Sequence, residues 1–124
     1  VIKIDRATLD YEVVISGLSG PHHIRPHSEG YMLSNSRKGE VLVFDKNFEV
    51  VKRIPGTSPW FPVKWVQDAI ELSSGSHLIA DCNLFKLRER QQDGKEKSFN
   101  TKMPNRIFQI EPVSDTFNFG NKAI

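Results

Sequence analysis

The chain has 124 residues and a mass of 14.1 kDa, which suits one ordinary domain and is too little for two independent cores. Its 38% hydrophobic and 26% charged residues exclude a disordered tail and a membrane protein, so we expect no membrane partner. The 17 basic and 15 acidic side chains leave a net charge of +2, which does not point to a nucleic-acid partner.

Short strands separated by turn residues are predicted along the whole chain. A first hairpin is expected from two similar apolar segments, and the same pattern recurs downstream with Gly, Asn, Asp and Pro at the turns. In chain order, the strands are expected at residues 1–5, 11–14, around Ile24, at 31–34, 40–45 and 48–54, in a pair within 68–81, and at 107–111 and 117–119.

Two blocks of the sequence repeat. Residues 23–35 align with residues 69–81, with a spacing of 46 residues from His23 to Ala69. Each block reads as a strand, a polar turn containing glycine, and a short apolar strand that ends in a small residue and Asn or Asp. The repeat predicts a four-stranded antiparallel meander of about 45 residues, which must stack on a neighbour to bury its faces.

The block of residues 68–81, followed by residues 105–110, resembles the blades of the six-bladed β-propeller superfamily. This superfamily includes NHL-repeat proteins, the senescence-marker and paraoxonase lactonases, and the arylsulfotransferase-like propellers. The resemblance implies an all-β fold of antiparallel meanders packed as blades in an incomplete ring. The alternative is a two-layer β-sandwich with a coincidental duplication.

Counted as blades, the chain amounts to about two and a half. Residues 1–19 are expected to give two strands of one blade, 20–58 a full blade, and 66–124 a further blade with an inserted, charged loop at 84–104. That loop reads as a solvated segment or as a contact for an anionic partner. We expect the remaining blades to come from the same longer chain or from other copies, since an open ring exposes strand edges.

In a propeller, the start of the innermost strand and the end of the second strand share one face, the mouth of the central channel. This places His22, His23 and Asn35 together at one blade, and Asp68 with Asp81 at the next. Polar side chains that converge in this way predict a binding site.

Further candidates lie beside this mouth or away from it. Arg25, on the same inner strand as the histidine pair, is predicted to bind ligand. Trp60 and Trp65 lie in the link between blades, where they either fill space or line a ligand pocket. His27 and His77 are expected at the opposite face, near the turn between the first two strands of a blade.

The lactonase-like propellers hold calcium through the Asn or Asp before the first apolar residue of the inner strand. The resemblance implies this role for Asp68 and, more loosely, for the histidines that precede Ile24. A histidine pair favours zinc or acid–base chemistry instead. The expected metal ligands are therefore His23 and Asp68, with calcium or zinc as the ion and His22 and His23 as catalytic residues. Each of these side chains equally suits a hydrogen-bonded turn position.

Two functions follow from this pattern. The first is a propeller segment that forms a ligand- or protein-binding surface. The alternative is part of a metal-dependent propeller hydrolase or lyase acting on a small polar substrate in the central channel, so enzyme activity is left open. Cys82 is the single cysteine and is expected to be a buried thiol, which excludes an internal disulfide and favours a soluble, cytoplasmic protein.

Overall fold

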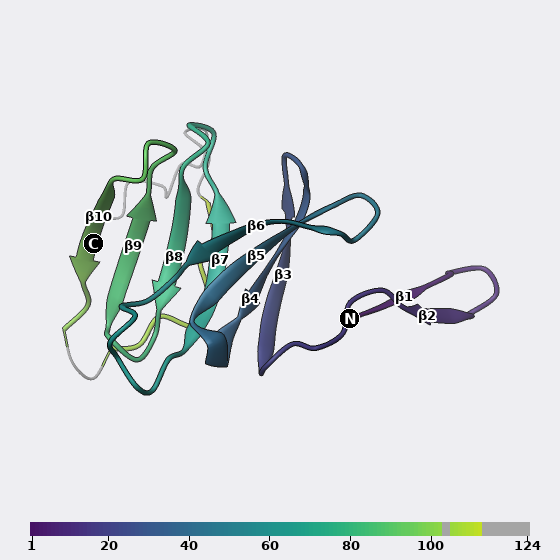
Figure 1. Ribbon diagram of the computed structural model, residues 1–124, viewed down its shortest axis with the longest axis horizontal. Helices are drawn as coiled ribbons and strands as arrows, with labels where there is room; N and C mark the ends of the chain where they lie inside the picture. The colour runs from purple at the N-terminus through teal and green to yellow at the C-terminus, as the bar shows by residue number, and fades with distance from the viewer. Residues whose placement is uncertain (103–104, 113–124) are drawn as a thin grey trace, which may run out of the picture.

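The computed structural model describes residues 1–102 and 105–112, whose strands form three antiparallel sheets (Figure 1). The predicted strand at residues 117–119 lies outside the described residues. Within the part that is described, no helix has the length and apolar character needed to span a bilayer. The elements in chain order are β1 (Ile2–Ile4), β2 (Tyr11–Val13), β3 (Pro21–His27), β4 (Gly30–Asn35), the short 3-10 helix η1 (Ser36–Lys38), β5 (Glu40–Asp45), β6 (Val50–Pro55), β7 (Val66–Glu71), β8 (His77–Asp81), β9 (Lys86–Arg90) and β10 (Glu96–Asn100).

Two four-stranded meanders dominate the structure. One sheet has the order β3-β4-β5-β6 and the other β7-β8-β9-β10, so each uses consecutive strands in chain order. β3 and β4 both contact β7, which sets the first strands of the two sheets beside each other while the sheets pack face to face (Figure 1). The all-β class and the antiparallel four-stranded meanders are therefore confirmed. The described residues form no closed ring. We call these sheets blade A (β3–β6) and blade B (β7–β10).

The interface between the blades is the main apolar core. Side chains alternate along a strand, so β4 and β5 each send one set of side chains toward blade B and the other set away from it. Both strands are almost wholly buried, and β5 reads as a continuous apolar run for that reason. The interface core consists of Met32, Val41, Val43 and Ile54 from blade A and Val66, Ala69 and Ile79 from blade B.

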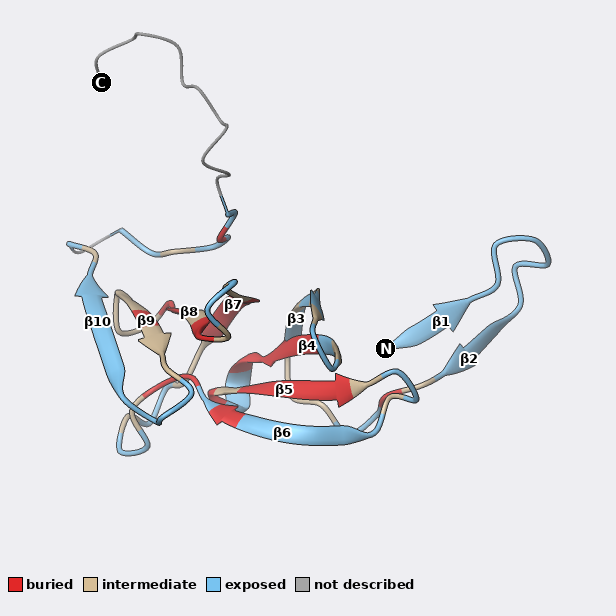
Figure 2. Ribbon diagram, turned by 90° about the horizontal axis from the view of Figure 1, so that it is seen from above, coloured by how far each residue is buried: buried red, intermediate tan, exposed pale blue. Residues whose placement is uncertain are grey.

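The opposite face of blade A has its own apolar cluster. Leu33, Leu42 and Phe44 pack with Ile15, which lies in the segment that joins the β1–β2 hairpin to β3. The hairpin itself is exposed and extends away from the blades, whereas the middle strands of blade A are buried and its outer strand β6 is mostly exposed (Figure 2). This face is therefore only partly covered by the described residues.

The far face of blade B is covered by residues 105–112. Ile110 is buried against Ile70 and Ala80, and Ile107 packs at the edge of the same cluster. The prediction of a strand at residues 107–111 was wrong, because these residues pair with no strand and lie against β7 instead. Their apolar spacing resembles that of β5, but it serves to pack this segment on a sheet rather than to extend one.

The prediction of an inserted loop at residues 84–104 was also wrong for most of that segment. Residues 86–90 and 96–100 are the strands β9 and β10, which pair in register from Glu96 opposite Arg90 to Asn100 opposite Lys86. β10 is exposed along its whole length, so nothing selects apolar residues there. A strand at the outer edge of a blade can therefore carry many charged residues, and the charges of this segment do not indicate a loop.

Candidate functional site

The inner strands of the two blades have the same irregularity at the predicted channel mouth. The pairing of β3 with β4 shifts register between Pro21 and Ile24, and that of β7 with β8 shifts between Val66 and Asp68. A bulge re-aims the side chains within it and is frequent beside functional sites. Here the adjacent His22 and His23 both face the chain around the start of β7, His22 against Trp65 and His23 against Gln67, although neighbouring strand residues normally point to opposite faces.

His22 forms one wall of the mouth together with Trp65. Its Nδ1 lies 3.1 Å from the Gly20 carbonyl oxygen and 3.0 Å from the Ser36 hydroxyl, and its ring meets the Trp65 ring edge-on at 4.9 Å between centroids. The Trp65 indole N–H donates to the Gln67 side-chain oxygen at 2.6 Å. Both rings are therefore fixed in orientation by hydrogen bonds.

These side chains border a hollow of about 420 Å³, which lies within the size range of small-ligand pockets. Its walls come from blade A, from blade B and from the segment after β10, so three separate parts of the chain converge on it. None of the lining residues is acidic, and one is an arginine. The lining residues are His22, Trp65, Gln67, Cys82, Asn83, Arg106 and Phe108.

Arg106 and Cys82 set the electrostatics of this hollow. The Arg106 guanidinium lies over the Phe85 ring, 5.7 Å from its centroid, which holds the cation at the rim. Burial raises the pKa of the Cys82 thiol, and the nearby Arg106 offsets only part of that rise. The thiol therefore stays protonated and is no nucleophile at neutral pH. The prediction of a buried thiol is confirmed.

His23 and Asp68, the predicted metal ligands, lie near each other, but each already has protein partners. His23 Nδ1 is 3.1 Å from the Gln67 carbonyl oxygen and 3.7 Å from Asp68 Oδ1. The fully buried Asp68 carboxylate accepts hydrogen bonds from Arg25 and from the backbone N–H groups of Ala69 and Ile110. These donors occupy the lone pairs that a metal ion would need.

Arg25 ties three chain segments together. It binds Asp68 in a bidentate manner, with Nε 3.1 Å from Oδ1 and Nη2 2.6 Å from Oδ2. Its Nη1 reaches Glu111 at 3.2 Å, and Nη2 also donates to the Ile110 carbonyl oxygen. The hydrogen bond with Asp68 raises the pKa of Arg25 further above its ordinary value. The inner strands β3 and β7 are thus linked to each other, and both are linked to residues 105–112.

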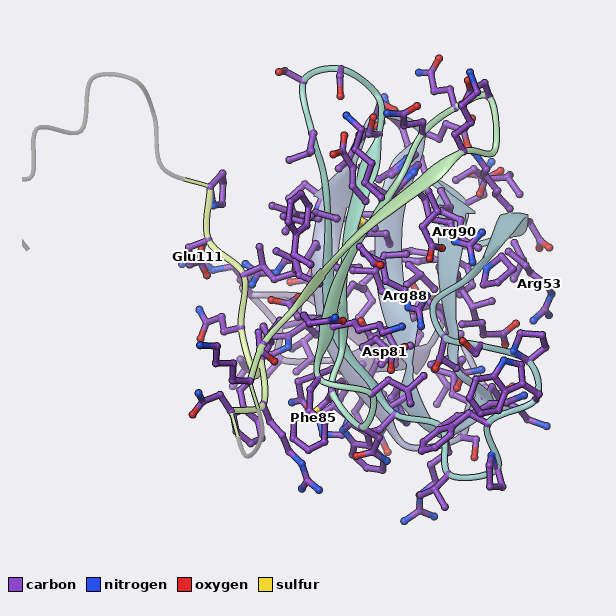
Figure 3. The ribbon with its side chains drawn as sticks, turned by 90° about the vertical axis from the view of Figure 1, so that its left-hand side faces the viewer. Arg53, Asp81, Phe85, Arg88, Arg90 and Glu111 are labelled. Atoms are coloured by element: carbon purple, nitrogen blue, oxygen red, sulfur yellow. The ribbon has the colours of Figure 1, made fainter. Side chains whose placement is uncertain are left out.

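Asn35 and Asp81, two further predicted binding residues, are buried. Asn35 accepts from the Ser19 N–H and donates to Glu40, so its amide fixes the entry into β3. Asp81 faces Arg88 across β8 and β9, with Arg88 Nε 2.9 Å from Oδ2 (Figure 3). Its Oδ1 is buried without a hydrogen-bond partner among the described residues.

Trp60 does not join the mouth. Its side chain is 75% exposed and contacts the edge of the Phe61 ring, while Trp65 alone of the two tryptophans lines the hollow. Arg106 and Phe108 were not predicted as site residues, because a strand of blade B was expected at residues 107–111. The available sequence signal was Arg106, a basic residue followed directly by the apolar pair Ile107 and Phe108.

A second cluster forms at the other ends of the same strands. His27 ends β3, Glu71 ends β7 and His77 begins β8. The Nε2 atoms of the two histidines are 2.9 Å apart, their rings are stacked at 5.2 Å, and His27 Nε2 is 3.5 Å from Glu71 Oε1. One ligand atom from each residue lies within 4.8 Å of the others, so the three side chains can hold a metal ion. Both histidines were expected on the face opposite the mouth, but their proximity to Glu71 was not predicted.

The ionisation of this cluster follows from its burial and its hydrogen bonds. Burial lowers the pKa of His77, and the proximity of His27 and of the Lys52 ammonium lowers it further. Burial alone would raise the pKa of Glu71, but hydrogen bonds from the Ser28 hydroxyl and N–H, together with the two histidines, bring it below its ordinary value. His77 is therefore neutral and Glu71 ionised at neutral pH.

No protein-family model matches the chain, and no curated protein matches it. Among solved structures, the chain is similar to a streptogramin B lyase, a β-propeller, with a TM-score of 0.56 and 18% sequence identity. The similarity covers 69% of this chain and 28% of the lyase chain. At this identity the likeness shows the fold alone, and the fold of the described chain is propeller-like.

Proposed function

We propose that this chain is a segment of a β-propeller of the six-bladed superfamily and that the hollow at its channel mouth binds a small polar ligand. The remaining blades come from the same longer chain or from other copies. The apolar face of blade A that the described residues leave partly open supports this, because propeller blades bury such faces against neighbours. Residues 105–112 occupy the corresponding place on blade B, where the inner strand of a further blade would begin.

The observation that carries the binding function is the convergence of three chain segments on one hollow with aromatic, amide and cationic groups. Trp65 and Phe108 offer flat apolar surfaces, Asn83 and Gln67 offer amides, and Arg106 offers a guanidinium that matches a carboxylate. The absence of acidic lining residues favours an anion. A small carboxylate with an apolar body fits this chemistry best, and a carboxylate-bearing segment of a protein ligand would use the same groups.

The test uses Trp65 as a fluorescent reporter. The chain has two tryptophans, and Trp60→Phe removes the exposed one and leaves Trp65 as the single emitter. In this background, titration with a panel of small mono- and dicarboxylates should change the emission of Trp65 in a saturable way. Arg106→Ala should weaken binding about 10- to 100-fold, because a hydrogen bond to a charged group contributes about 1.5–3 kcal/mol.

The matched control is Arg6→Ala, which removes the same charge from the exposed β1–β2 turn. It should leave binding unchanged. A flat response across the panel, or equal weakening by the two arginine substitutions, would contradict a carboxylate site at the mouth.

The second candidate function is part of a metal-dependent propeller lyase or hydrolase acting on a small polar substrate in the channel. The likeness to a lyase favours it, as do His22, which lines the hollow, and His23, which contacts the lining residue Gln67. The two histidines would act as acid–base groups. A calcium or zinc ion in such an enzyme would need ligands other than Asp68, whose carboxylate is already hydrogen-bonded within the protein. Elimination or hydrolysis that depends on His22 or His23 and on an added divalent ion would support this function, whereas binding without turnover would support the first.

A further inference from the structure

We propose that His27, Glu71 and His77 bind one transition-metal ion of the zinc class, and that this ion links blade A to blade B at the ends of β3 and β7. This site lies at the opposite ends of the inner strands from the channel mouth. It does not depend on the ligand proposed for the mouth.

The ligand atoms are already close to the geometry that zinc needs. Zinc–nitrogen bonds of about 2.0–2.1 Å at a tetrahedral angle place two nitrogens roughly 3.3 Å apart. The two Nε2 atoms stand 2.9 Å apart and Glu71 Oε1 lies 3.5 Å from His27 Nε2, so the rings need to separate only slightly. Three protein ligands leave a fourth position for water.

The donor set selects the class of metal. Two imidazole nitrogens and one carboxylate oxygen suit zinc and its neighbours in the transition series, whereas calcium takes six to eight oxygen ligands. The low pKa of His77 keeps its ring in the neutral form that binds metal, and Glu71 is held as an anion. Glu29 adds a negative charge near the cluster and Lys52 a positive one.

The surrounding hydrogen bonds position Glu71, whereas the hydrogen bond to His27 must break when the ion binds. The Ser28 hydroxyl and N–H both donate to Glu71, at 2.6 and 2.7 Å, and fix its carboxylate beside the histidines. The Glu29 N–H donates to His27 Nδ1, which leaves the ring proton on Nε2, facing His77. When the ion replaces that proton between the rings, the proton moves to Nδ1 through solvent and the exposed Glu29 hydrogen bond opens. No proton is gained or lost in this exchange.

The linking role follows from where the ligands lie. His27 belongs to blade A, and Glu71 and His77 belong to blade B, so one ion spans the interface. An ion that binds only the folded arrangement stabilises it, and the stabilisation rises with the logarithm of the free ion concentration once that concentration exceeds Kd. Zinc should therefore raise the melting temperature of the chain, and a chelator should reverse the rise.

The experiment is a competition titration of the whole chain with Zn²⁺ against a chromophoric chelator, repeated with Co²⁺ and Ca²⁺. We expect one tightly bound Zn²⁺ per chain, visible absorption bands from Co²⁺ in a low-symmetry site, and no comparable binding of Ca²⁺. His27→Gln and Glu71→Gln should each weaken Zn²⁺ binding by more than about 100-fold, and Ser28→Ala by about 10- to 100-fold. The matched control Glu12→Gln makes the same carboxylate-to-amide change as Glu71→Gln on the exposed strand β2 and should bind Zn²⁺ normally.

Circular dichroism establishes that each variant is folded. Glu71→Gln changes a side chain that is 20% exposed, so the test does not rely on the buried side chains of His27 and His77 alone. Zinc binding that is unchanged in both variants, or that is lost equally in Glu12→Gln, would overturn the proposal. So would Ca²⁺ binding as tight as that of Zn²⁺, or a melting temperature that Zn²⁺ does not raise.

Discussion

Asp68 is the residue on which the contact between the inner strands depends. Its buried carboxylate receives two donors from Arg25 and two backbone N–H groups, one of them from Ile110 in the segment after β10. Removing one partner of a buried ion pair is costly because the other is left without compensation. Arg25 is 20% exposed at its side chain, which moderates that cost.

Asp68→Asn should lower the free energy of unfolding by about 3 kcal/mol, because the amide cannot accept all four donors and leaves the Arg25 charge with only the exposed Glu111 as its partner. Urea denaturation followed by circular dichroism measures this loss. The control is Glu111→Gln, which weakens the exposed contact of the same arginine and should change stability little. Equal losses of stability in the two variants would show that the buried pair contributes no more than the exposed contact.

The sequence indicated that Asp68 is important to the inner strand, but it did not indicate that Arg25 is its partner. Its place before an apolar inner strand is visible in the sequence, and the resemblance to lactonase-like propellers suggested a metal. The partner Arg25 lies 43 residues away, and only the stacking of β3 on β7 brings the two together. Contacts of this kind depend on strand register, which composition and spacing do not reveal.

At the scale of the element, the turn between β3 and β4 requires glycine. Gly30 has a φ of +154°, and a Cβ there would lie 2.5 Å from the Phe44 carbonyl oxygen of β5. This turn also carries His27 and Ser28, so its shape sets one side of the proposed metal site. Glycine at this point therefore serves both the sheet and the cluster.

Gly30→Ala should lower stability by more than the roughly 1 kcal/mol that a positive φ alone costs a residue with a side chain, because the methyl group also meets backbone. The measurement is the melting temperature, with Zn²⁺ affinity as a second readout. Gly94→Ala is the control, since Gly94 has a φ of +83° and open space around it. If Gly94→Ala proved as damaging as Gly30→Ala, the close approach to β5 would not matter.

The strands differ in how well the sequence predicted them. β4, β5, β7 and β8 alternate or run apolar because blade faces cover them, and they were expected close to where they lie. β9 and β10 were missed because they form the outer half of blade B, where few apolar residues are needed. Leu87 is the one aliphatic residue of β9, and the edge strand β10 is fully exposed. The segment around Ile110 was misassigned because apolar alternation also marks a segment that packs on a sheet without joining it.

At the scale of the whole molecule, the two blades share one core, and we expect them to unfold together. Ile79→Ala, at the centre of that core, should lower the free energy of unfolding by about 2–5 kcal/mol, because it removes buried volume from both blades. Circular dichroism and Trp65 fluorescence should give coincident transitions in urea. Val51→Ala on the exposed face of β6 is the control and should have little effect. Separate transitions for the two probes would mean that the blades are independent.

The two outer strands, β6 and β10, limit how further units can be added to the molecule. β6 and β10 end the hydrogen bonding of their sheets and carry Lys52, Arg53 and Lys97 on exposed positions. Charged side chains on an edge strand hinder the addition of a further strand from another molecule, which is the first step of edge-to-edge aggregation. New units can therefore be added by stacking on a blade face, as gene duplication at the 46-residue spacing would do, while the rim of the assembly stays closed to growth.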